Sequence, residues 1–391
     1  MTVRPQMRIL HCGKFFPPDR GGMETFLGDL TNAQAMAGDT VQVLAHAGSC
    51  PPGTVEPAPG LSVQRAAVLL ALGGYAPVAP TLPFLYLQAL RRFRPDVIHV
   101  HAPNGAALWP ALLRSRAPLV LHWHADVQFP QDRQPAPLLL ACWRHVEGLV
   151  LRKADAIIAT SHAYLDSSAS LAGHRQKCRV VPLGLADAAV PPLQDHPALR
   201  FLDSSPGLRV LAVGRLAHYK GFRLLCEAIE EVPEASLCIV GAGEVRAELE
   251  AVASGHGVRG RIHLAGELPD ALLHACYHRS HVLCAPSLTR SEAFGMVLLE
   301  AMSRGLPCIA TTVSGSGMSV VVQHGETGLL VRPGSVCELA QALRRLAADP
   351  ELRARMGQAG RQRFREHFTI AEVARRIRAV YADILAASPK V

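Results

Sequence analysis

The sequence predicts an α/β protein made of two doubly wound domains, each a parallel β-sheet with helices on both faces. Short apolar runs alternate with longer helical patterns along the 391 residues, as in repeated strand–helix units. Several of these runs are apolar nearly throughout, which is typical of parallel strands covered on both faces. The alternation stops once, in a Pro-rich stretch, and then starts again. Two similar halves are therefore expected.

The first half forms the first predicted domain, residues 1–190. Its expected strands are 7–12, 41–45, 97–101, 119–123, 156–160 and 180–182. Helices are expected between them, for example at 23–37 and 138–153. Residues 186–206 contain several prolines among mixed polar residues, so we expect the interdomain linker there.

The second half forms the second predicted domain, residues 205–368. Its expected strands are 208–213, 237–240, 261–265, 282–285, 308–311 and 329–331. Its expected helices are 222–231, 245–253, 294–304, 335–348 and 350–366, and a last helix follows at 370–387. Ligands of open α/β sheets bind beyond the carboxyl ends of the strands. The cleft between two such domains is therefore the expected active site.

Composition limits the class of protein. The net charge is +8, which indicates either anionic partners or simply an Arg-rich chain. The ten cysteines are scattered singly with no CxxC pair, so we expect free thiols in a reducing compartment rather than disulfides or a zinc site. The N-terminus lacks the pattern of a secretory signal. These features together predict a cytoplasmic protein.

One long stretch, between Arg65 and Arg91, contains no charged residue. Its length is compatible with a membrane span, but interior glycines and prolines break it, and each helix-interior proline costs ~3 kcal/mol. Two alternatives remain: a buried loop and helix, or an apolar surface that contacts a membrane or a lipid acceptor. The basic run 91–94 that follows supports peripheral contact with an anionic inner membrane.

Two loops predict a phosphate site. Gly21 and Gly22 stand between the first strand and the first helix, where backbone N–H groups and the helix dipole favour an anion, although such a turn often binds nothing. The loop Gly214–Gly221 places Arg215 and Lys220 after the first strand of the second domain. A guanidinium and an ammonium group suit a diphosphate. The alternative is two solvated surface cations.

Two carboxylates follow in the second domain. Glu292 and Glu300 are separated by seven residues, a span of ~12 Å along a helix. Carboxylates accept hydrogen bonds from hydroxyl groups, so one could hold the sugar end and the other the ribose end of a nucleotide-sugar. Glu300 lies in an apolar run and needs a partner. The alternative is a structural glutamate that caps or pairs with Arg304, one turn on.

Four histidines cluster on two expected strands. Residues two apart share a strand face, so His99 with His101 could converge with His122 and His124. A metal site is conceivable, but only Asp126 could complete it, so no metal is expected. We expect His99 and His122 in the core and His124 facing the cleft.

Missing patterns narrow the function further. The sequence has no Asp-x-Asp pair to hold a metal-bound diphosphate, which leaves neutralisation to Arg215, Lys220 and backbone amides. The run Gly241–Arg246 has arginine where a dinucleotide fingerprint needs its third glycine, which argues against NAD. There is also no phosphate-binding GxxxxGK(S/T) loop and no GxSxG elbow.

Nearly the whole chain resembles the retaining glycosyltransferases of family 4, which have the two-domain GT-B fold of facing Rossmann-like domains. The Glu-x7-Glu pattern in its Phe-Gly setting is the most specific signal. The residues that carry the resemblance are Pro17–Pro18, Gly21–Glu24, His122–Asp126, Lys177–Gly184, Gly214–Gly221, Ser291–Met302 and His324–Gly328.

The resemblance assigns roles to single residues. It implies that Arg215 and Lys220 bind the donor diphosphate, that Glu292 contacts the transferred sugar and that Glu300 holds the ribose. It further implies that backbone amides near Phe294 and Gly295 assist, that Gly21 and Gly22 face the diphosphate and acceptor, and that His124 lies beside the sugar. In this fold the last helix, within residues 369–391, usually packs back on the first domain.

The resemblance also implies an activity: retaining transfer of a mannose- or glucose-type hexose to a glycan or lipid-linked acceptor in bacterial exopolysaccharide or lipopolysaccharide synthesis. GDP-mannose and UDP-glucose are both open as donors. No cofactor, metal or nucleic acid is expected. Two alternatives share the fold, a nucleotide-sugar 2-epimerase and a catalytically silent binding homologue. Leu183 and the segment 127–130 depart from the family pattern, and the second change bears on the acceptor.

Overall fold

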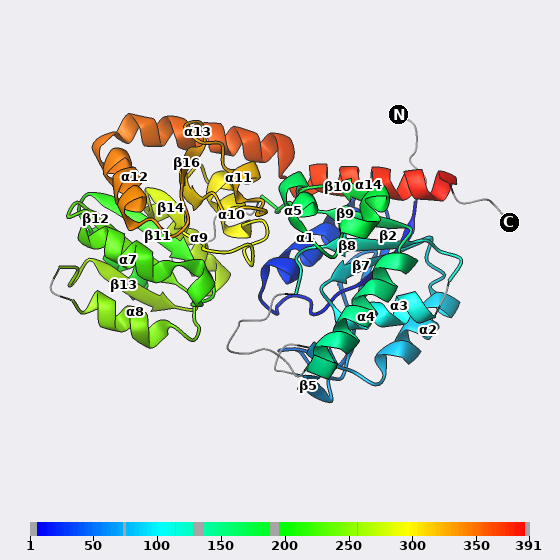
Figure 1. Ribbon diagram of the computed structural model, residues 1–391. Coiled ribbons are helices and arrows are strands. Elements are labelled where there is room, and N and C mark those ends of the chain that lie inside the picture. Colours follow the sequence, from blue (N-terminus) through cyan, green and yellow to red (C-terminus); the bar gives the residue numbers. More distant parts are fainter. Residues whose placement is uncertain are drawn as a thin grey trace. The chain divides into compact units, whose positions relative to one another are not determined.

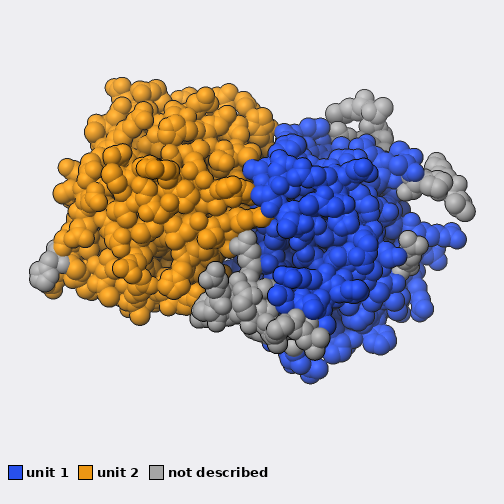
Figure 2. Space-filling model, viewed as in Figure 1, with its two compact units in different colours: residues 1–186, 370–391 blue, residues 187–369 orange. Residues whose placement is uncertain are grey.

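Two compact units make up the protein (Figure 1). The computed structural model describes residues 6–72, 76–113, 115–127, 137–187, 195–255 and 257–387. Unit 1 contains residues 1–186 and 370–391, and unit 2 contains residues 187–369 (Figure 2). Each unit is built around its own, mostly parallel sheet with helices, so the predicted fold class is confirmed.

Unit 1 has an eight-stranded sheet in the order β10-β9-β8-β7-β1-β2-β4-β3. Its neighbouring strands are parallel except for β3, which runs antiparallel to β4. The strands are β1 (Arg8–Cys12), β2 (Thr40–His46), β3 (Gly53–Ala58), β4 (Leu61–Ala66), β7 (Val97–Ala102), β8 (Leu119–Trp123), β9 (Ala156–Ala159) and β10 (Cys178–Val180). A separate hairpin pairs β5 (Leu70–Leu72) with β6 (Ala76–Val78). β3, β4 and this hairpin were not predicted from the sequence.

The helices of unit 1 include one from the C-terminal part of the chain. They are α1 (Gly22–Met36), α2 (Leu82–Arg92), α3 (Leu108–Leu112), α4 (Pro137–Lys153), α5 (His162–Ser167) and α14 (Ile370–Ala387). α14 packs against α1. Its buried residues Val373, Ile377, Val380 and Tyr381 follow helical spacing and form one apolar stripe. That stripe explains why the helix belongs to unit 1.

Unit 2 has a six-stranded, all-parallel sheet in the order β13-β12-β11-β14-β15-β16. Its strands are β11 (Leu208–Val213), β12 (Ala235–Val240), β13 (Ile262–Gly266), β14 (Val282–Ala285), β15 (Cys308–Thr311) and β16 (Gly328–Val331). Its helices are α6 (Pro197–Ser204), α7 (Phe222–Glu230), α8 (Arg246–Ala253), α9 (Asp270–Arg279), α10 (Met296–Ser303), α11 (Met318–Val321), α12 (Val336–Ala348) and α13 (Pro350–His367). β12 and β14 are buried at every position, as expected of strands covered on both faces.

The expected linker 186–206 is wrong at its C-terminal end, where α6 belongs to unit 2. His196 caps this helix by accepting a hydrogen bond from the N–H of Ala198, and Pro197 occupies its first turn. Leu199 and Leu202 are buried, and the helix packs against α9, β12 and β13. The prolines therefore mark a helix start as well as a connection. Residues 188–194 lie outside the described part of the chain.

The uncharged stretch after Arg65 forms the β5–β6 hairpin and α2. Part of this stretch is buried, and contact with a membrane or a lipid acceptor stays a prediction. Leu82 and Tyr86 are buried, whereas Leu69 and Phe84 are each 71% exposed. Among the described residues, no helix combines the length and apolar character needed to cross a membrane.

Candidate active site

The candidate site residues of unit 2 follow two adjacent strands, β11 and β14. The chain runs from β11 outward to β12 and β13, then returns to the other side of β11 at β14. This reversal is a topological switch point, where open α/β sheets bind their ligands at the carboxyl ends of the strands. The Gly214–Gly221 loop follows β11, and the segment leading to Glu292 follows β14.

Lys220 and Glu292 join these two loops directly. Lys220 Nζ donates a hydrogen bond to Glu292 Oε2 over 2.5 Å, and the two side chains are 12% and 14% exposed. Burial alone would lower the pKa of Lys220, but the charge of Glu292 outweighs it and the pKa is raised. Lys220 is therefore a fixed cation at neutral pH. The sequence predicted both residues as site residues but did not reveal the hydrogen bond between them.

Glycines allow the first loop to pack this closely. Gly221 has φ 70°, and a side chain there would lie 2.2 Å from the carbonyl oxygen of Pro286. Beside it, the N–H of Leu288 donates to the carbonyl of Tyr219 over 2.7 Å. A Cβ on Gly214 would come within 2.9 Å of Lys220 Nζ. Glycine at both ends of the loop, Gly214 and Gly221, thus lets the loop pack closely around Lys220 and against the segment after β14.

Arg215 is the exposed cation of the same loop. Its guanidinium lies 5.7 Å from the ring centre of Tyr219, and Lys220 Nζ is the same distance from that ring. A cation near an aromatic face is attracted by the ring quadrupole. Tyr219 therefore lies within cation–π range of both cations, a contact that the sequence reasoning missed.

The turn from Glu292 to Gly295 is held by the loop after β15. Ser316 Oγ donates to the carbonyl of Glu292 over 2.5 Å, and the N–H of Gly317 donates to the carbonyl of Ala293 over 2.7 Å. Phe294 is 2% exposed and works as an anchor for this turn. Gly295 has φ 88° and precedes α10, so this helix begins two residues later than the sequence predicted.

Glu300 lies on α10 and has a partner that the sequence did not reveal. The hydroxyl group of buried Tyr277, on α9, donates to Glu300 Oε2 over 2.6 Å. Burial raises the pKa of Glu300, and the Tyr277 hydrogen bond offsets part of that rise. Arg304 donates instead to the backbone carbonyl of Glu300, over 2.7 Å. The structural alternative therefore takes another form, because Arg304 bonds the backbone of Glu300 while Tyr277 bonds its side chain.

In unit 1, Gly21 and Gly22 begin α1, directly after the loop that follows β1. Both are exposed. The carboxylate of Glu24 bends back over Gly21, where an added Cβ would lie 2.2 Å from Glu24 Oε2. Burial raises the pKa of Glu24. The glycine turn thus accommodates a carboxylate of its own chain at the positive end of the helix, as the helix dipole favours.

His124 follows β8 and is 7% exposed. The turn after it is anchored by Asp126, whose Oδ1 accepts from Trp123 Nε1 over 2.8 Å and from Ser168 Oγ over 2.7 Å. The Phe26 ring of α1 meets the His124 ring edge-on at 5.5 Å. Burial lowers the pKa of His124 to about 3, so the imidazole is neutral at pH 7. His124 can exchange hydrogen bonds with a ligand, but it does not supply a positive charge.

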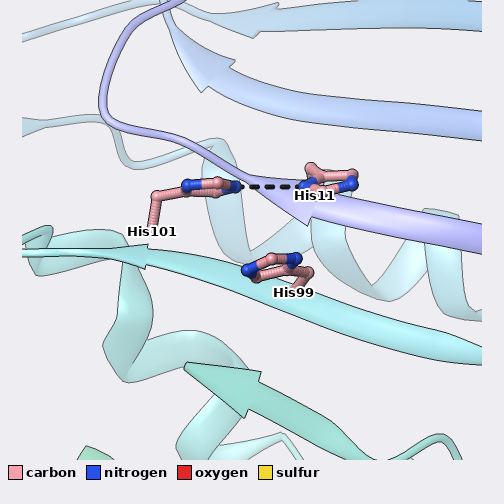
Figure 3. A group of neighbouring side chains, drawn as sticks. All are labelled: His11, His99 and His101. Atoms are coloured by element: carbon pink, nitrogen blue, oxygen red, sulfur yellow. Dashed lines mark hydrogen bonds between the residues drawn. The ribbon is translucent and has the colours of Figure 1, made fainter. Parts of the chain in front are cut away.

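The histidine cluster contains a fifth member, His11 on β1, which the sequence reasoning missed. Two triads have ring nitrogens within 4.8 Å of one another: His11 with His99 and His101, and His101 with His122 and His124. Figure 3 shows the first triad, with the His99 ring stacked on that of His101 and tilted by 35° against that of His11. The ring planes are 5° apart for His99 and His122 but 28° apart for His11 and His101. The contacts that join the cluster include hydrogen bonds between ring nitrogens, His11 Nδ1 with His101 Nε2 and His101 Nδ1 with His124 Nε2.

Comparison with known proteins identifies the family. Residues 20–188 match the model of Glycosyltransferase Family 4, and residues 204–363 match that of Glycosyl transferases group 1. The D-rhamnosyltransferase WbpZ of Pseudomonas aeruginosa is 32% identical over 379 residues, which cover 93% of this chain and 92% of that protein. The chain belongs to glycosyltransferase family 4. The family resemblance predicted from its sequence is therefore confirmed.

Other similarities of this family 4 glycosyltransferase agree. The O-antigen chain mannosyltransferase C of Escherichia coli is 28% identical over 93% of this chain and 95% of that protein. The structure of a sucrose-phosphate synthase from Thermosynechococcus elongatus superimposes with a TM-score of 0.81 at 24% identity, over 98% of this chain and 100% of that one. This structural likeness shows a shared fold. The roles of single site residues remain predictions.

Proposed function

We propose that this glycosyltransferase moves a hexose of the mannose or glucose type from a nucleotide diphosphate sugar to a glycan or lipid-linked acceptor. The relatives named as rhamnosyl- and mannosyltransferases, one of them for O-antigen chains, support a role in bacterial polysaccharide or lipopolysaccharide synthesis. We propose further that transfer needs no metal and retains the anomeric configuration. GDP-mannose and UDP-glucose are both candidate donors.

The Lys220–Glu292 pair is the observation that carries this proposal. It holds a permanent ammonium group at the switch point of unit 2, with the Arg215 guanidinium on the same loop. Two fixed cations there can balance the charge that grows on a leaving diphosphate, which is the task of a metal ion in other transferases. Glu292 has a second carboxylate oxygen, which can accept a hydrogen bond from a sugar hydroxyl.

The proposed reaction is a same-face displacement. The bond between the anomeric carbon and the diphosphate oxygen breaks, and the diphosphate leaves with the bonding electrons. The acceptor hydroxyl oxygen forms the new bond on the same face, and its proton passes to a diphosphate oxygen. Arg215 and Lys220 stabilise the leaving group, Glu300 holds the ribose and neutral His124 binds the sugar.

Part of the acceptor surface is proposed to lie in the stretch 66–92. Leu69, Leu70 and Phe84 are exposed there at 71%, 46% and 71%, and Arg91 and Arg92 follow in the last turn of α2. Exposed apolar side chains beside basic ones suit the surface of an anionic bilayer, where a lipid-linked acceptor resides. We therefore propose peripheral membrane contact by unit 1 of a cytoplasmic enzyme.

A donor screen followed by product analysis tests the proposal. The purified protein is mixed with UDP-, GDP- and ADP-sugars, with and without a chelator, and its melting temperature is recorded, because a ligand of the native state raises that temperature. The donor that binds is then incubated with and without a lipid-linked acceptor. Acceptor-dependent transfer with chelator present is the expected result. Isomerisation of the donor alone would indicate an epimerase, and binding without turnover a silent homologue.

A further inference from the structure

A ladder of histidines crosses the sheet of unit 1. His11 lies on β1 opposite His99 of β7, and His101 of β7 lies opposite His122 of β8. His124 completes the ladder just beyond the end of β8. Four of the five side chains are 0% exposed, and His124 is 7% exposed. The accessible end of the ladder is therefore His124, the residue proposed to meet the sugar.

Three of these histidines form one hydrogen-bonded chain with a glutamine. Gln34 Oε1 on α1 lies 2.8 Å from His11 Nε2. His11 Nδ1 lies 3.1 Å from His101 Nε2, the contact drawn as a dashed line in Figure 3. His101 Nδ1 in turn lies 3.0 Å from His124 Nε2. In each of the three histidines, Nε2 therefore faces the Gln34 end of the chain of hydrogen bonds, and Nδ1 faces the opposite end.

Gln34 sets the direction of this chain. Its amide nitrogen donates to the hydroxyl group of Tyr381, on α14, over 3.4 Å. That hydroxyl group is itself hydrogen-bonded to His99 Nδ1. Because the amide nitrogen donates to Tyr381, the amide oxygen is left to accept a hydrogen bond from His11. The helix from the C-terminal part of the chain therefore orients the amide that begins the chain.

The proton positions follow from one donor per ring. Burial lowers the pKa of His11 to about 4 and that of His124 to about 3, and it lowers the pKa of His101 well below 6.5. A neutral imidazole has one N–H donor and one acceptor nitrogen. His11 donates its Nε2–H in a hydrogen bond to Gln34 Oε1, so its Nδ1 must accept a hydrogen bond from His101 Nε2. His101 Nδ1 must then accept from His124 Nε2.

We infer that Gln34, acting through His11 and His101, holds His124 as the Nε2–H tautomer, with Nδ1 as a bare acceptor for a hydroxyl group of the ligand. This inference rests on the proposed function only for the statement that the hydroxyl belongs to a sugar. Gln34, His11 and His101 are positioning residues, because they act through His124. The tautomer of a histidine is generally set by the bond that its other nitrogen makes.

The proton positions can be measured without any substrate. Long-range ¹H–¹⁵N NMR on protein labelled at histidine nitrogens distinguishes the two neutral tautomers and the cation. The His124 signals are identified by their loss in His124→Asn. We expect Nε2–H in the wild type at pH 7. Gln34→Met keeps the side-chain length but removes the acceptor, and should give a mixture of His124 tautomers and a roughly tenfold lower kcat, the scale of one hydrogen bond.

His122→Leu is the matched control. His122 lies in the same ladder, is equally buried and stacks on His124 at 4.4 Å, but neither of its ring nitrogens has a hydrogen-bond partner among the described residues. This variant should lower stability while leaving the His124 tautomer and kcat close to wild type. A loss that comes only from disturbed packing would affect both variants alike.

Two results would overturn the inference. The first is a wild-type His124 that carries its proton on Nδ1 or is an imidazolium at pH 7, as when the Gln34 amide is turned over. The second is a folded Gln34→Met protein whose His124 tautomer is unchanged. The wild-type spectrum tests the His124 tautomer by itself, even if Gln34→Met does not fold. The expected tautomer in a protein that transfers no sugar would instead contradict the proposed function and leave this inference intact.

Discussion

The hydroxyl group of Tyr277 donates a hydrogen bond to Glu300 across 2.6 Å, and so joins α9 to α10 inside unit 2. Because burial raises the pKa of Glu300, this bond helps to keep the carboxylate ionised and in place for the ribose that it is proposed to hold.

Tyr277→Phe should raise the pKa of Glu300 further and weaken nucleotide binding roughly tenfold, the scale of one hydrogen bond to a charged group. The loss should grow as the pH falls, because a protonated Glu300 is a poorer acceptor for the ribose hydroxyls. Calorimetry at pH 6 and pH 8 measures both effects. A deoxyribose nucleotide serves as control: it should bind wild type and variant with nearly the same affinity, and an undiminished difference would mean that Glu300 does not hold the ribose.

Lys220→Met removes the ammonium group but keeps the side-chain stem. Turnover should fall by roughly 100-fold or more, the cost of losing one preorganised charge at a leaving group. Stability should also fall, by about 3 kcal/mol, because Glu292 is left as an unpaired and mostly buried carboxylate. Steady-state kinetics and chemical denaturation measure the two losses separately.

The double variant Lys220→Met with Glu292→Gln distinguishes the two roles. It removes both charges, so stability should recover in part while turnover stays low. If turnover recovered with stability, the pair would be structural and its assignment to the donor site would be wrong.

Arg215→Ala should weaken donor binding by roughly 10- to 100-fold, as expected for one charge-assisted contact to a diphosphate. The loss should shrink at high salt. Arg223→Ala is the control, since Arg223 stands on α7 soon after the same loop but pairs with Glu227 and Glu248 at the surface. That substitution should change donor affinity little. Equal losses for both variants would point to a general charge effect.

Mild acid should destabilise unit 1. The five histidines of the ladder are buried with pKa values lowered from 6.5, to about 4 for His11 and about 3 for His124. Below pH 6.5 the unfolded chain therefore binds more protons than the folded one. The stability that these groups contribute is present above pH 6.5 and declines as the pH falls toward 4, by about 1 kcal/mol per pH unit for each histidine.

Denaturant unfolding between pH 7.5 and pH 5 measures this slope. His122→Leu should reduce the slope of unfolding free energy against pH by the contribution of about one proton. The variant should nevertheless be less stable than wild type at pH 7.5. If wild type and variant had the same slope, the pKa of His122 would not differ between the folded and unfolded states.

Replacing Leu69 and Phe84 by serine should weaken binding to vesicles that contain anionic lipid. Arg91→Gln should weaken it by about fivefold, since a basic residue near such a surface contributes ~1 kcal/mol. Met36→Ser is the control, because Met36 is 89% exposed on α1 but outside the stretch 66–92. Co-sedimentation with phosphatidylglycerol vesicles measures binding. If neither wild type nor variants sedimented, membrane contact would be excluded under those conditions.

Local patterns in the sequence predicted the parallel sheets and the loops of the site. Strands such as β12 and β14 are short apolar runs, and Arg215 and Lys220 stand directly after one of them. Such features depend on neighbours in the chain.

The parts that could not be predicted depend on contacts between distant segments. Lys220 and Glu292 are 72 residues apart, and Tyr277 reaches Glu300 from another helix. His11 stood alone in its strand, and only the pairing of β1 with β7 shows that it joins His99. Helix α6 was missed because a cap and a proline at its first turn resemble a loop in sequence.

Unit 1 is discontinuous, and this has a consequence for synthesis. His99 of its ladder is hydrogen-bonded to Tyr381, which is translated after the whole of unit 2. Domains tend to fold in the order in which they leave the ribosome. Here the segment 187–369 can complete its fold first, while the earlier 1–186 keeps the α1 surface that α14 will cover exposed to solvent. Unit 1 can therefore complete its fold only after α14 has been synthesised.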